Sequence, residues 1–353
     1  MTQTQPEIQK ITLSNKDSMS VDLTNFGATI MSINVPDKHG TLGDVVVGYN
    51  QPEDYRDKDN PSMGVPGRYA GRIEGGSFQL EGATYTLDQN NGRHCLHGGN
   101  NSLYKTTWNI EAVSPQSVTF GCISPEGDGG NGIDRTGFPG NLDVRVTYTL
   151  TDNNAIKIHY EAQTDKPTVL NLTNHTYFNL AGEASGRNVT DLMLTMPAKE
   201  YLAVDAEMLP QEIVPVAGTP FDFTTPKPLS HALAHTDDPQ INIAGGGIDH
   251  TFLIPDYDGT TLRLAAHAED RESGRSMDVY TTELSMQVYT PNSLSTIPTK
   301  DGSKQHGQHD AICFETQHLP DSPNHPEYPT TILNPGERYT SETIYQFSVQ
   351  AQR

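Results

Sequence analysis

The stretch Leu142-Asp-Val-Arg-Val-Thr-Tyr-Thr-Leu150 alternates apolar or aromatic residues with polar ones at every step. The stretch Ala155-Ile-Lys-Ile-His-Tyr160 follows it after Asp152-Asn-Asn154, a cluster of residues that favours a turn. Because successive side chains of a strand point to opposite faces of its sheet, a spacing of two residues predicts strands with one buried face. Alternating runs separated by turn residues are typical of antiparallel sheets.

This pattern of short β-prone runs separated by turn residues continues along the chain, from Asp44-Val-Val-Val-Gly-Tyr49 to Ile344-Tyr-Gln-Phe-Ser-Val349. The 31 glycines and 24 prolines among 353 residues exceed the roughly 12% that these two types usually contribute, which indicates many turns. The best helix candidate, Ser230 to His235, is too short to organise a fold. No linker, repeat or change of composition divides the chain. The sequence therefore predicts an all-β protein, with residues 1–353 folded as a single large antiparallel β-sandwich domain.

The charge of the chain narrows the classes of partner. There are 23 lysines and arginines against 44 aspartates and glutamates, which gives a formal net charge of −21. Nucleic acids are held mainly by cationic side chains on phosphates, and anionic membrane surfaces attract basic segments. We therefore expect neither nucleic-acid nor membrane binding, whereas a neutral small-molecule substrate meets no such repulsion.

The first twenty residues contain neither the basic nor the apolar segment of a signal peptide, and no stretch approaches the roughly 18 apolar residues of a membrane span. The three cysteines, Cys95, Cys122 and Cys313, are odd in number and far apart, so they predict no disulfide framework and no metal knuckle. We expect a soluble, cytoplasmic protein.

A glycine-rich segment at residues 124–141 superficially resembles a calcium-binding loop. Its candidate ligands are Asp128, Asn131 and Asp134, but the spacing lacks a ligand at every second position and the terminal glutamate that such loops use. We interpret this segment as a surface loop and predict no metal site in the protein.

The chain has 13 histidines, the side chains most easily used as acids or bases near neutral pH. His231 and His235 would share a helix face but lack the glutamate of a zinc-binding motif, so we expect a solvated turn there. His306, His309 and His325 lie in polar segments rich in glycine and proline, which predicts surface loops.

Three stretches embed reactive polar side chains among apolar ones: residues 170–180, 247–254 and 311–317. In the second, Asp249 and His250 would point to opposite faces of a strand, so only one of them can line a given pocket. In the third, Glu315 would either be buried, with a raised pKa suited to a base, or point to solvent by alternation. In the first, His175 fits either a structural histidine or an acid–base group. A histidine and a glutamate suffice for general acid–base chemistry without a metal or cofactor.

Several segments, taken in order, resemble the aldose 1-epimerases, also called galactose mutarotases, over nearly the whole length of the chain. The order and spacing of the segments are the specific feature, above all around His175 and Glu315. The resemblance implies a β-supersandwich fold. The matching segments are Thr24-Asn-Phe-Gly-Ala-Thr-Ile30, Gly67-Arg-Tyr-Ala-Gly-Arg-Ile73, Leu96-His-Gly-Gly99, Gly137-Phe-Pro-Gly-Asn-Leu142, Asn171-Leu-Thr-Asn-His-Thr-Tyr-Phe-Asn-Leu180, Asp249-His250, Gln287-Val-Tyr-Thr290, Phe314-Glu-Thr-Gln-His-Leu-Pro-Asp-Ser-Pro-Asn-His-Pro326 and Asn334-Pro-Gly336.

The resemblance also implies an activity: an isomerase of carbohydrate metabolism that interconverts the α and β anomers of free aldohexoses such as galactose and glucose, without cofactor, as a monomer or homodimer. It implies that Glu315 is the general base, which takes the C1 hydroxyl proton, and that His175, charged, is the general acid, which protonates the ring oxygen. The implied sugar-binding residues are Arg72, His97, Asp249, Gln287 and, beside the acid, Tyr177.

The chain departs from the family pattern at three places. Gly71 stands where asparagine usually precedes the arginine, so we expect one polar contact to be missing or supplied from elsewhere. The stretch Glu283-Leu-Ser285 lacks the usual Pro-Gly turn, and Pro291 replaces a glycine. The last two departures bear on the segment around Gln287 rather than on the catalytic pair.

Two other functions remain open. A hexose-6-phosphate mutarotase would need a cationic clamp for the phosphate, which the low content of basic residues disfavours. A non-catalytic sugar-binding domain would use Arg72 and Asp249 but would have no use for a paired His175 and Glu315. The presence of both members of the pair favours the enzyme.

Overall fold

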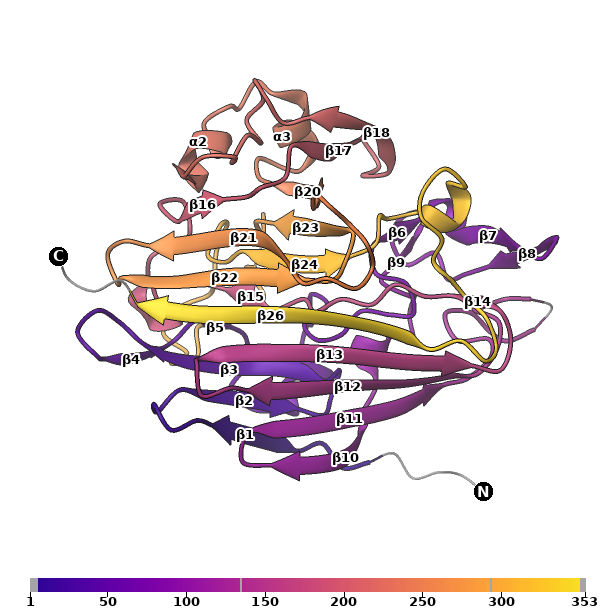
Figure 1. Ribbon diagram of the computed structural model, residues 1–353, viewed down its shortest axis with the longest axis horizontal. Helices are drawn as coiled ribbons and strands as arrows, with labels where there is room; N and C mark the ends of the chain where they lie inside the picture. The colour runs from indigo at the N-terminus through magenta and orange to yellow at the C-terminus, as the bar shows by residue number, and fades with distance from the viewer. Residues whose placement is uncertain (1–5, 134, 293, 350–353) are drawn as a thin grey trace.

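The computed structural model describes residues 6–133, 135–292 and 294–349. Antiparallel strands dominate it, which confirms the all-β prediction (Figure 1). Its largest sheet has nine strands, in the spatial order β10 (Asn109–Ser114), β11 (Ser117–Ser124), β12 (Leu142–Leu150), β13 (Ala155–Thr164), β26 (Tyr339–Val349), β22 (Arg275–Thr281), β21 (Arg263–Asp270), β16 (Met193–Thr195) and β19 (Lys227–Pro228).

Two smaller sheets complete the main layers. One contains β1 (Lys10–Ser14), β2 (Ser20–Thr24), β3 (Thr29–Pro36) and β4 (Leu42–Asp44). The other has the order β18 (Pro210–Pro215), β17 (Glu200–Val204), β20 (Asp249–Leu253), β23 (Ser285–Tyr289) and β24 (Cys313–Gln317). Strand pairs are formed by β5 (Val46–Val47) with β15 (Tyr177–Phe178), β6 (Arg72–Ile73) with β9 (Cys95–Leu96), β7 (Ser77–Leu80) with β8 (Ala83–Thr86), and β14 (Thr168–Val169) with β25 (Ile332–Leu333).

The helices in the described residues are all short. In Figure 1, α2 and α3 lie at the end of the molecule opposite β1–β4. The α-helices are α1 (Asp54–Asp57), α2 (Leu229–Leu233) and α3 (Pro239–Ile243), and the 3₁₀ turns are η1 (Glu74–Gly76), η2 (Leu103–Lys105), η3 (Glu183–Ser185) and η4 (Ser322–Asn324). None of the described helices is long and apolar enough to cross a membrane.

The alternating stretch Leu142–Leu150 forms β12, and its apolar residues are buried while the residues between them are partly exposed. It pairs antiparallel with β13, from Leu142 opposite Thr164 to Leu150 opposite Ile156. The buried face of the nine-stranded sheet packs against both smaller sheets, since Val146 shares one apolar cluster with residues of β2 and β24. The hydrophobic core therefore lies between the packed sheets and is stabilised by the burial of apolar surface.

Strand β24 differs from β12 because all five of its residues are buried. Phe314 belongs to the sandwich core, while Glu315 and Gln317 point to the other side and line a cavity. The solvent-facing alternative for Glu315 is therefore wrong: the exposed fraction of this residue is 2%. Its strand lies between the core and the cavity.

The glycine-rich loop at residues 124–141 is anchored by Arg68, whose exposed fraction is 1%. Its guanidinium donates hydrogen bonds to the carbonyl oxygens of Ser124, Pro125, Pro139 and Gly140 at 2.6–2.9 Å. Burial lowers the pKa of Arg68 to about 10, so it remains charged at neutral pH. The arginine holds the two ends of the loop together.

In the described part of this loop, no group of three His, Cys, Asp or Glu side chains is placed to hold a metal ion. Asp128 accepts a hydrogen bond of 2.5 Å from Ser124 Oγ, and Asn131 accepts one from Thr136. Asp134 lies outside the described residues. The prediction that this segment is a surface loop without a metal remains a prediction for the complete loop.

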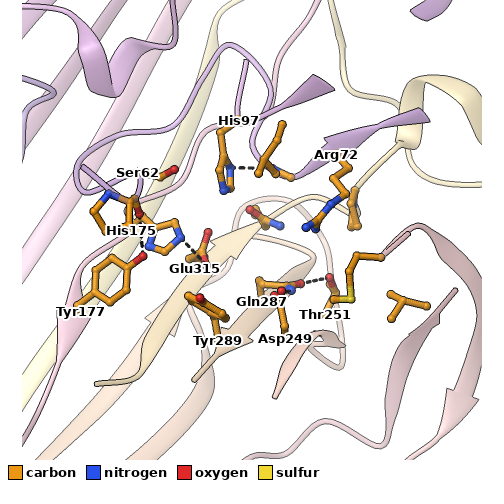
Figure 2. Close-up of a pocket in the computed structure, with 17 residues that line it drawn as sticks. Ser62, Arg72, His97, His175, Tyr177, Asp249, Thr251, Gln287, Tyr289 and Glu315 are labelled. Atoms are coloured by element: carbon orange, nitrogen blue, oxygen red, sulfur yellow. Dashed lines mark hydrogen bonds and ion pairs between the residues drawn. The ribbon is translucent and has the colours of Figure 1, made fainter. Parts of the chain in front are cut away.

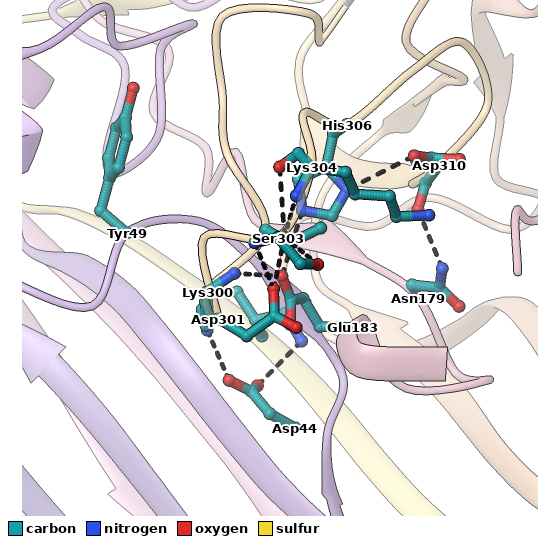
Figure 3. A network of polar contacts seen from close by, with 12 residues as sticks. Asp44, Tyr49, Asn179, Glu183, Lys300, Asp301, Ser303, Lys304, His306 and Asp310 are labelled. Atoms are coloured by element: carbon teal, nitrogen blue, oxygen red, sulfur yellow. Dashed lines mark hydrogen bonds and ion pairs between the residues drawn. The ribbon is translucent and has the colours of Figure 1, made fainter. Parts of the chain in front are cut away.

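The surface position expected for His306 is wrong, because only 4% of this residue is exposed. Its ring contacts Glu183 (3.1 Å) and Asp310 (3.4 Å), as Figure 3 shows. Although burial alone would raise the pKa of Glu183, hydrogen bonds from His306 and from the Lys300 amide lower it. Lys300 also pairs with Asp44. The polar composition of this segment reflects a buried ionic network rather than exposure.

This network anchors the segment 294–311. Leu294 and Ile297 of the segment pack in one apolar cluster with Tyr177 and Cys313. The ionic contacts on one side and the apolar contacts on the other hold the segment against β15 and β24.

The other histidines lie as follows. His231 lies in α2 and is partly buried, so the solvated turn expected there is wrong for it, whereas His235, just after this helix, is exposed and its Nδ1 contacts the carbonyl oxygen of His231. His309 and His325 are partly exposed. His250 is buried and packs on Phe221 (ring centroids 4.5 Å apart), on the face of β20 opposite Asp249, as alternation predicts.

We expect Arg68→Met to lower the free energy of unfolding by at least about 3 kcal/mol, because it leaves several buried carbonyl oxygens without a donor. Urea unfolding would measure the loss. The matched control is Arg145→Met, since Arg145 forms surface ion pairs with Glu111 and Asp143 and 41% of its side chain is exposed. Removing such pairs costs about 1 kcal/mol or less. Equal losses for the two variants would contradict the anchoring role of Arg68.

Candidate active site

The buried side chain of Asn171 joins three segments that are far apart in the sequence. Its backbone donates to Arg68 O (2.9 Å) and accepts from Ala70 N (2.8 Å), and its side-chain nitrogen donates to Ala70 O (3.1 Å). Its side-chain oxygen accepts from His318 N (2.9 Å). Three functional side chains lie within two to four residues of these contacts: Arg72 after Ala70, His175 after Asn171 and Glu315 before His318. These contacts therefore bring all three side chains together.

These segments enclose a cavity of about 230 Å³, shown in Figure 2. This is smaller than the roughly 300–1,000 Å³ of pockets for drug-sized ligands, so it suits a molecule the size of a single sugar ring. All seven residues predicted from the sequence line it. The lining residues are Pro61, Ser62, Gly71, Arg72, Leu96, His97, His175, Tyr177, Val204, Met208, Asp249, Thr251, Gln287, Tyr289, Glu315, Gln317 and Pro320.

His175 and Glu315 face each other, with Nε2 and Oε1 3.4 Å apart. The backbone N–H of His175 donates to Gly64 O (2.9 Å), and its ring stacks on Tyr177 with the centroids 4.9 Å apart. The Tyr177 hydroxyl donates to Pro61 O (2.7 Å). Tyr177, predicted as a sugar contact, therefore also supports the imidazole ring, and its hydroxyl proton is already engaged.

Burial controls the protonation of this pair. It lowers the pKa of His175 to about 4. Burial, followed by repulsion from Asp249, raises the pKa of Glu315 well above its ordinary value, although Arg72 opposes this shift. Burial therefore favours the uncharged form of the pair, with the proton on Glu315 rather than on His175. The charged His175 expected from the sequence is the less favoured form there.

His97 presents a hydrogen-bond donor to the cavity. Its Nδ1 accepts a hydrogen bond from the backbone N–H of Gly71 (3.2 Å). Burial, followed by repulsion from the protonated form of His175 and from Arg72, holds the pKa of His97 well below its ordinary value. A neutral imidazole that accepts at Nδ1 carries its proton on Nε2, so His97 can donate to an oxygen atom of a ligand.

Asp249 and Gln287 lie on the neighbouring strands β20 and β23. Gln287 Nε2 donates to Asp249 Oδ1 (2.6 Å), and Gln287 Oε1 accepts from Thr251. Burial raises the pKa of Asp249, while Arg72 and Gln287 oppose the shift. Gln287, predicted as a sugar contact, thus also orients the carboxylate of Asp249.

The departures from the family pattern leave Gln287 in a regular strand, since it pairs with Thr251 on one side and Glu315 on the other. Glu283 and Pro291 lie outside β23. Where the Pro-Gly turn is missing, the buried carboxylate of Glu283 contacts His318 Nδ1 (2.7 Å). The ion pair between Glu283 and His318 therefore stabilises the changed turn.

One group of metal-ligating side chains occurs among the described residues. Donor atoms of His97, His175 and Glu315 all lie within 4.8 Å of one another. Two neutral imidazoles and a carboxylate are ligands that zinc accepts. The expectation that the reaction uses no metal remains a prediction.

Sequence reasoning missed three polar residues of the cavity that alternation could have found. Thr251, Tyr289 and Gln317 each lie two residues beyond a predicted site residue on the same strand and therefore on the same face. Val204 and Met208 come from a segment where no motif indicated a site.

Comparison with known proteins places these features in a family. A family model described as aldose 1-epimerase matches residues 9–346. The chain is 38% identical over 341 residues to aldose 1-epimerase of Escherichia coli (strain K12), covering 96% of this chain and 94% of that protein. It is 38% identical over 344 residues to galactose mutarotase of Homo sapiens, covering 97% and 94%.

Solved structures agree in fold. An aldose epimerase homologue from C. elegans superimposes with a TM-score of 0.87 at 30% identity, covering 97% of this chain and 99% of that one. Galactose 1-epimerase from Lactobacillus acidophilus gives a TM-score of 0.82 at 29% identity, covering 98% and 95%. The fold is the galactose mutarotase-like supersandwich, and the chain belongs to the aldose 1-epimerase family.

Proposed function

We propose that this protein is an aldose 1-epimerase that interconverts the α and β anomers of free aldohexoses, galactose and glucose, by general acid–base catalysis. The observation that carries the proposal is the buried pair of His175 and Glu315, 3.4 Å apart at one wall of a cavity suited to one sugar ring. The names of the relatives support the same activity.

In the proposed mechanism, Glu315 accepts the proton of the C1 hydroxyl while His175 donates a proton to the ring oxygen. The bond between C1 and the ring oxygen breaks, and the sugar becomes an open-chain aldehyde. Rotation about the C1–C2 bond then exposes the other carbonyl face. Closure returns both protons and forms the other anomer, so nothing is consumed.

Burial assists this sequence of proton transfers. Before ring opening the pair must be charged, with Glu315 as a carboxylate and His175 as an imidazolium. Ring opening converts it to the uncharged form, which the pKa directions of both groups favour. The free energy of burying the two charges is therefore released as the ring opens. Bound hydroxyl groups would stabilise the charged form beforehand.

The remaining polar groups fit the binding of a neutral polyol. Arg72 can donate to hydroxyl oxygens, Asp249 can accept from hydroxyl protons, and His97 Nε2 can donate. Arg72 is the only lysine or arginine among the described residues that line the cavity. One arginine does not make a clamp for a phosphate dianion, which favours free hexoses over hexose 6-phosphates.

Other features of the protein remain part of the proposal. A single domain over residues 1–353 is supported by an apolar cluster that includes both Leu13 and Phe347. A cytoplasmic location fits three buried, free cysteines. The net charge of −21 favours a protein that does not bind nucleic acid. A monomer and a homodimer both agree with the proposed chemistry.

Polarimetry of freshly dissolved α-galactose and α-glucose tests the activity. Catalytic amounts of protein should accelerate the change of optical rotation, with and without EDTA. Glu315→Gln and His175→Asn should each lower kcat by at least about 100-fold, because each removes a proton-transfer group. The matched controls are Glu342→Gln and His159→Asn, which alter a partly exposed histidine–glutamate pair (3.8 Å) and should retain full activity.

Rates equal to buffer for every common aldohexose would contradict the proposed enzyme and leave a sugar-binding domain. Faster turnover of glucose 6-phosphate than of both free sugars would instead favour the phosphosugar mutarotase.

The pH dependence of kcat/KM should show a wide plateau. On the acid side the activity should fall near pH 4, where the pKa of His175 lies and a second proton leaves no base. On the alkaline side it should fall only well above the ordinary carboxyl pKa, once Glu315 has lost the shared proton. Polarimetry with the buffer rate subtracted measures the profile. An acid limb near pH 6.5, the ordinary pKa of histidine, would show that burial does not hold His175 uncharged.

A further inference from the structure

Gln317 is a buried wall residue of the cavity with no role in the mechanism above. It lies two residues after Glu315 on β24, so both side chains project from the same face of the strand. Its exposed fraction is 2%, and its side chain lines the cavity together with those of Arg72 and Pro320.

The side-chain oxygen of Gln317 is a buried acceptor without a donor. No described residue hydrogen-bonds to Oε1. The neighbouring amide of Gln287, by contrast, is engaged on both sides, by Asp249 and Thr251. A buried polar atom without a partner is costly, and most such atoms in proteins are satisfied. Because the side chain of Gln317 lines the cavity, a ligand hydroxyl that reaches its amide can supply the missing donor.

Gly71 is the residue whose missing side chain a contact from Gln317 could replace. It stands where the family resemblance leads us to expect asparagine, and its backbone has φ +79°. A Cβ atom there would lie 3.1 Å from Pro320 Cβ and 3.7 Å from Gln317 Nε2. The wall at this point therefore contains a glycine and a proline, and the amide of Gln317 is the polar side chain beside them.

We propose that Gln317 is a substrate-binding residue that accepts a hydrogen bond from a hydroxyl group of the aldose. The required partner is a donor, which a neutral sugar offers at each hydroxyl and a carboxylate or phosphate oxygen does not. Two residues along a strand correspond to about 6.5–7 Å. Because Glu315 acts at the C1 hydroxyl, Gln317 contacts a hydroxyl farther round the ring. This assignment rests on the proposed function.

A set of deoxy sugars tests the contact. We compare kcat/KM of the wild type and of Gln317→Met, which keeps the length of the side chain, on galactose and on its 2-, 3-, 4- and 6-deoxy analogues. Gln317→Met should raise KM for galactose about 3- to 10-fold with little change in kcat, as expected for one neutral hydrogen bond. For one deoxy analogue, the kcat/KM of the wild type should be lower than for galactose by a similar factor. Gln317→Met should not lower the kcat/KM for that analogue any further.

A purely structural role predicts a different pattern. Gln317→Met would then lower kcat/KM by the same factor for every sugar, and this result, or unchanged kinetics, would overturn the proposal. Thr316→Val alters the same strand on its opposite face and is the matched control, so it should show no analogue-specific effect. If Gln317→Met does not fold, Gln317→Asn, which shortens the side chain by one methylene, is compared across the same sugars.

Failure of the contact can be distinguished from failure of the proposed function. If the wild type accelerates anomer exchange for no aldose, the proposed function fails, and the affinity for galactose is measured by NMR titration instead. An affinity that falls about 3- to 10-fold in Gln317→Met would still support the contact. Equal affinities would overturn it.

Discussion

The hydrogen bonds of Asn171 are the contacts on which the active site depends. An amide has both donors and an acceptor, and here it uses them on Ala70 O and His318 N, while the backbone of the same residue bonds to the segment 68–70. These segments carry the residues that must meet around one sugar: Arg72, His175 and Glu315. Because Asn171 is fully buried, no water can replace a lost partner, so the three segments have one register relative to one another.

The second feature of the site is the low number of charges that it can hold. Glu315 and Asp249 line one cavity, and each has a raised pKa, with Arg72 as the cation that opposes both shifts. His175 and His97 have lowered pKa values for the same physical reason, which is burial. A site whose carboxyl groups and imidazoles are all shifted toward their neutral forms can accept and return protons without a large change in solvation.

The sequence predicted those parts of the fold in which one face of a strand is buried and the other is solvated, as in Leu142–Leu150. It could not decide whether Glu315 is buried, because β24 is covered on both faces. Alternation shows which residues share a face of this strand, but it does not show whether the face opposite the core lines a cavity or meets solvent. His306 was misplaced for a related reason: its partners Glu183 and Asp310 are recognised only in three dimensions. The site residues came from the family resemblance, and the two-residue period would have added Gln317.

In the proposed reaction, the protein moves protons between oxygen atoms of the sugar and leaves its C–H bonds intact. NMR exchange spectroscopy of galactose in D₂O tests this directly. With the protein present, the H1 signals of the α and β anomers should exchange faster than in buffer, and the intensities of H1 and H2 should remain constant. Loss of the H1 or H2 signal to deuterium, or exchange no faster than in buffer, would contradict this mechanism.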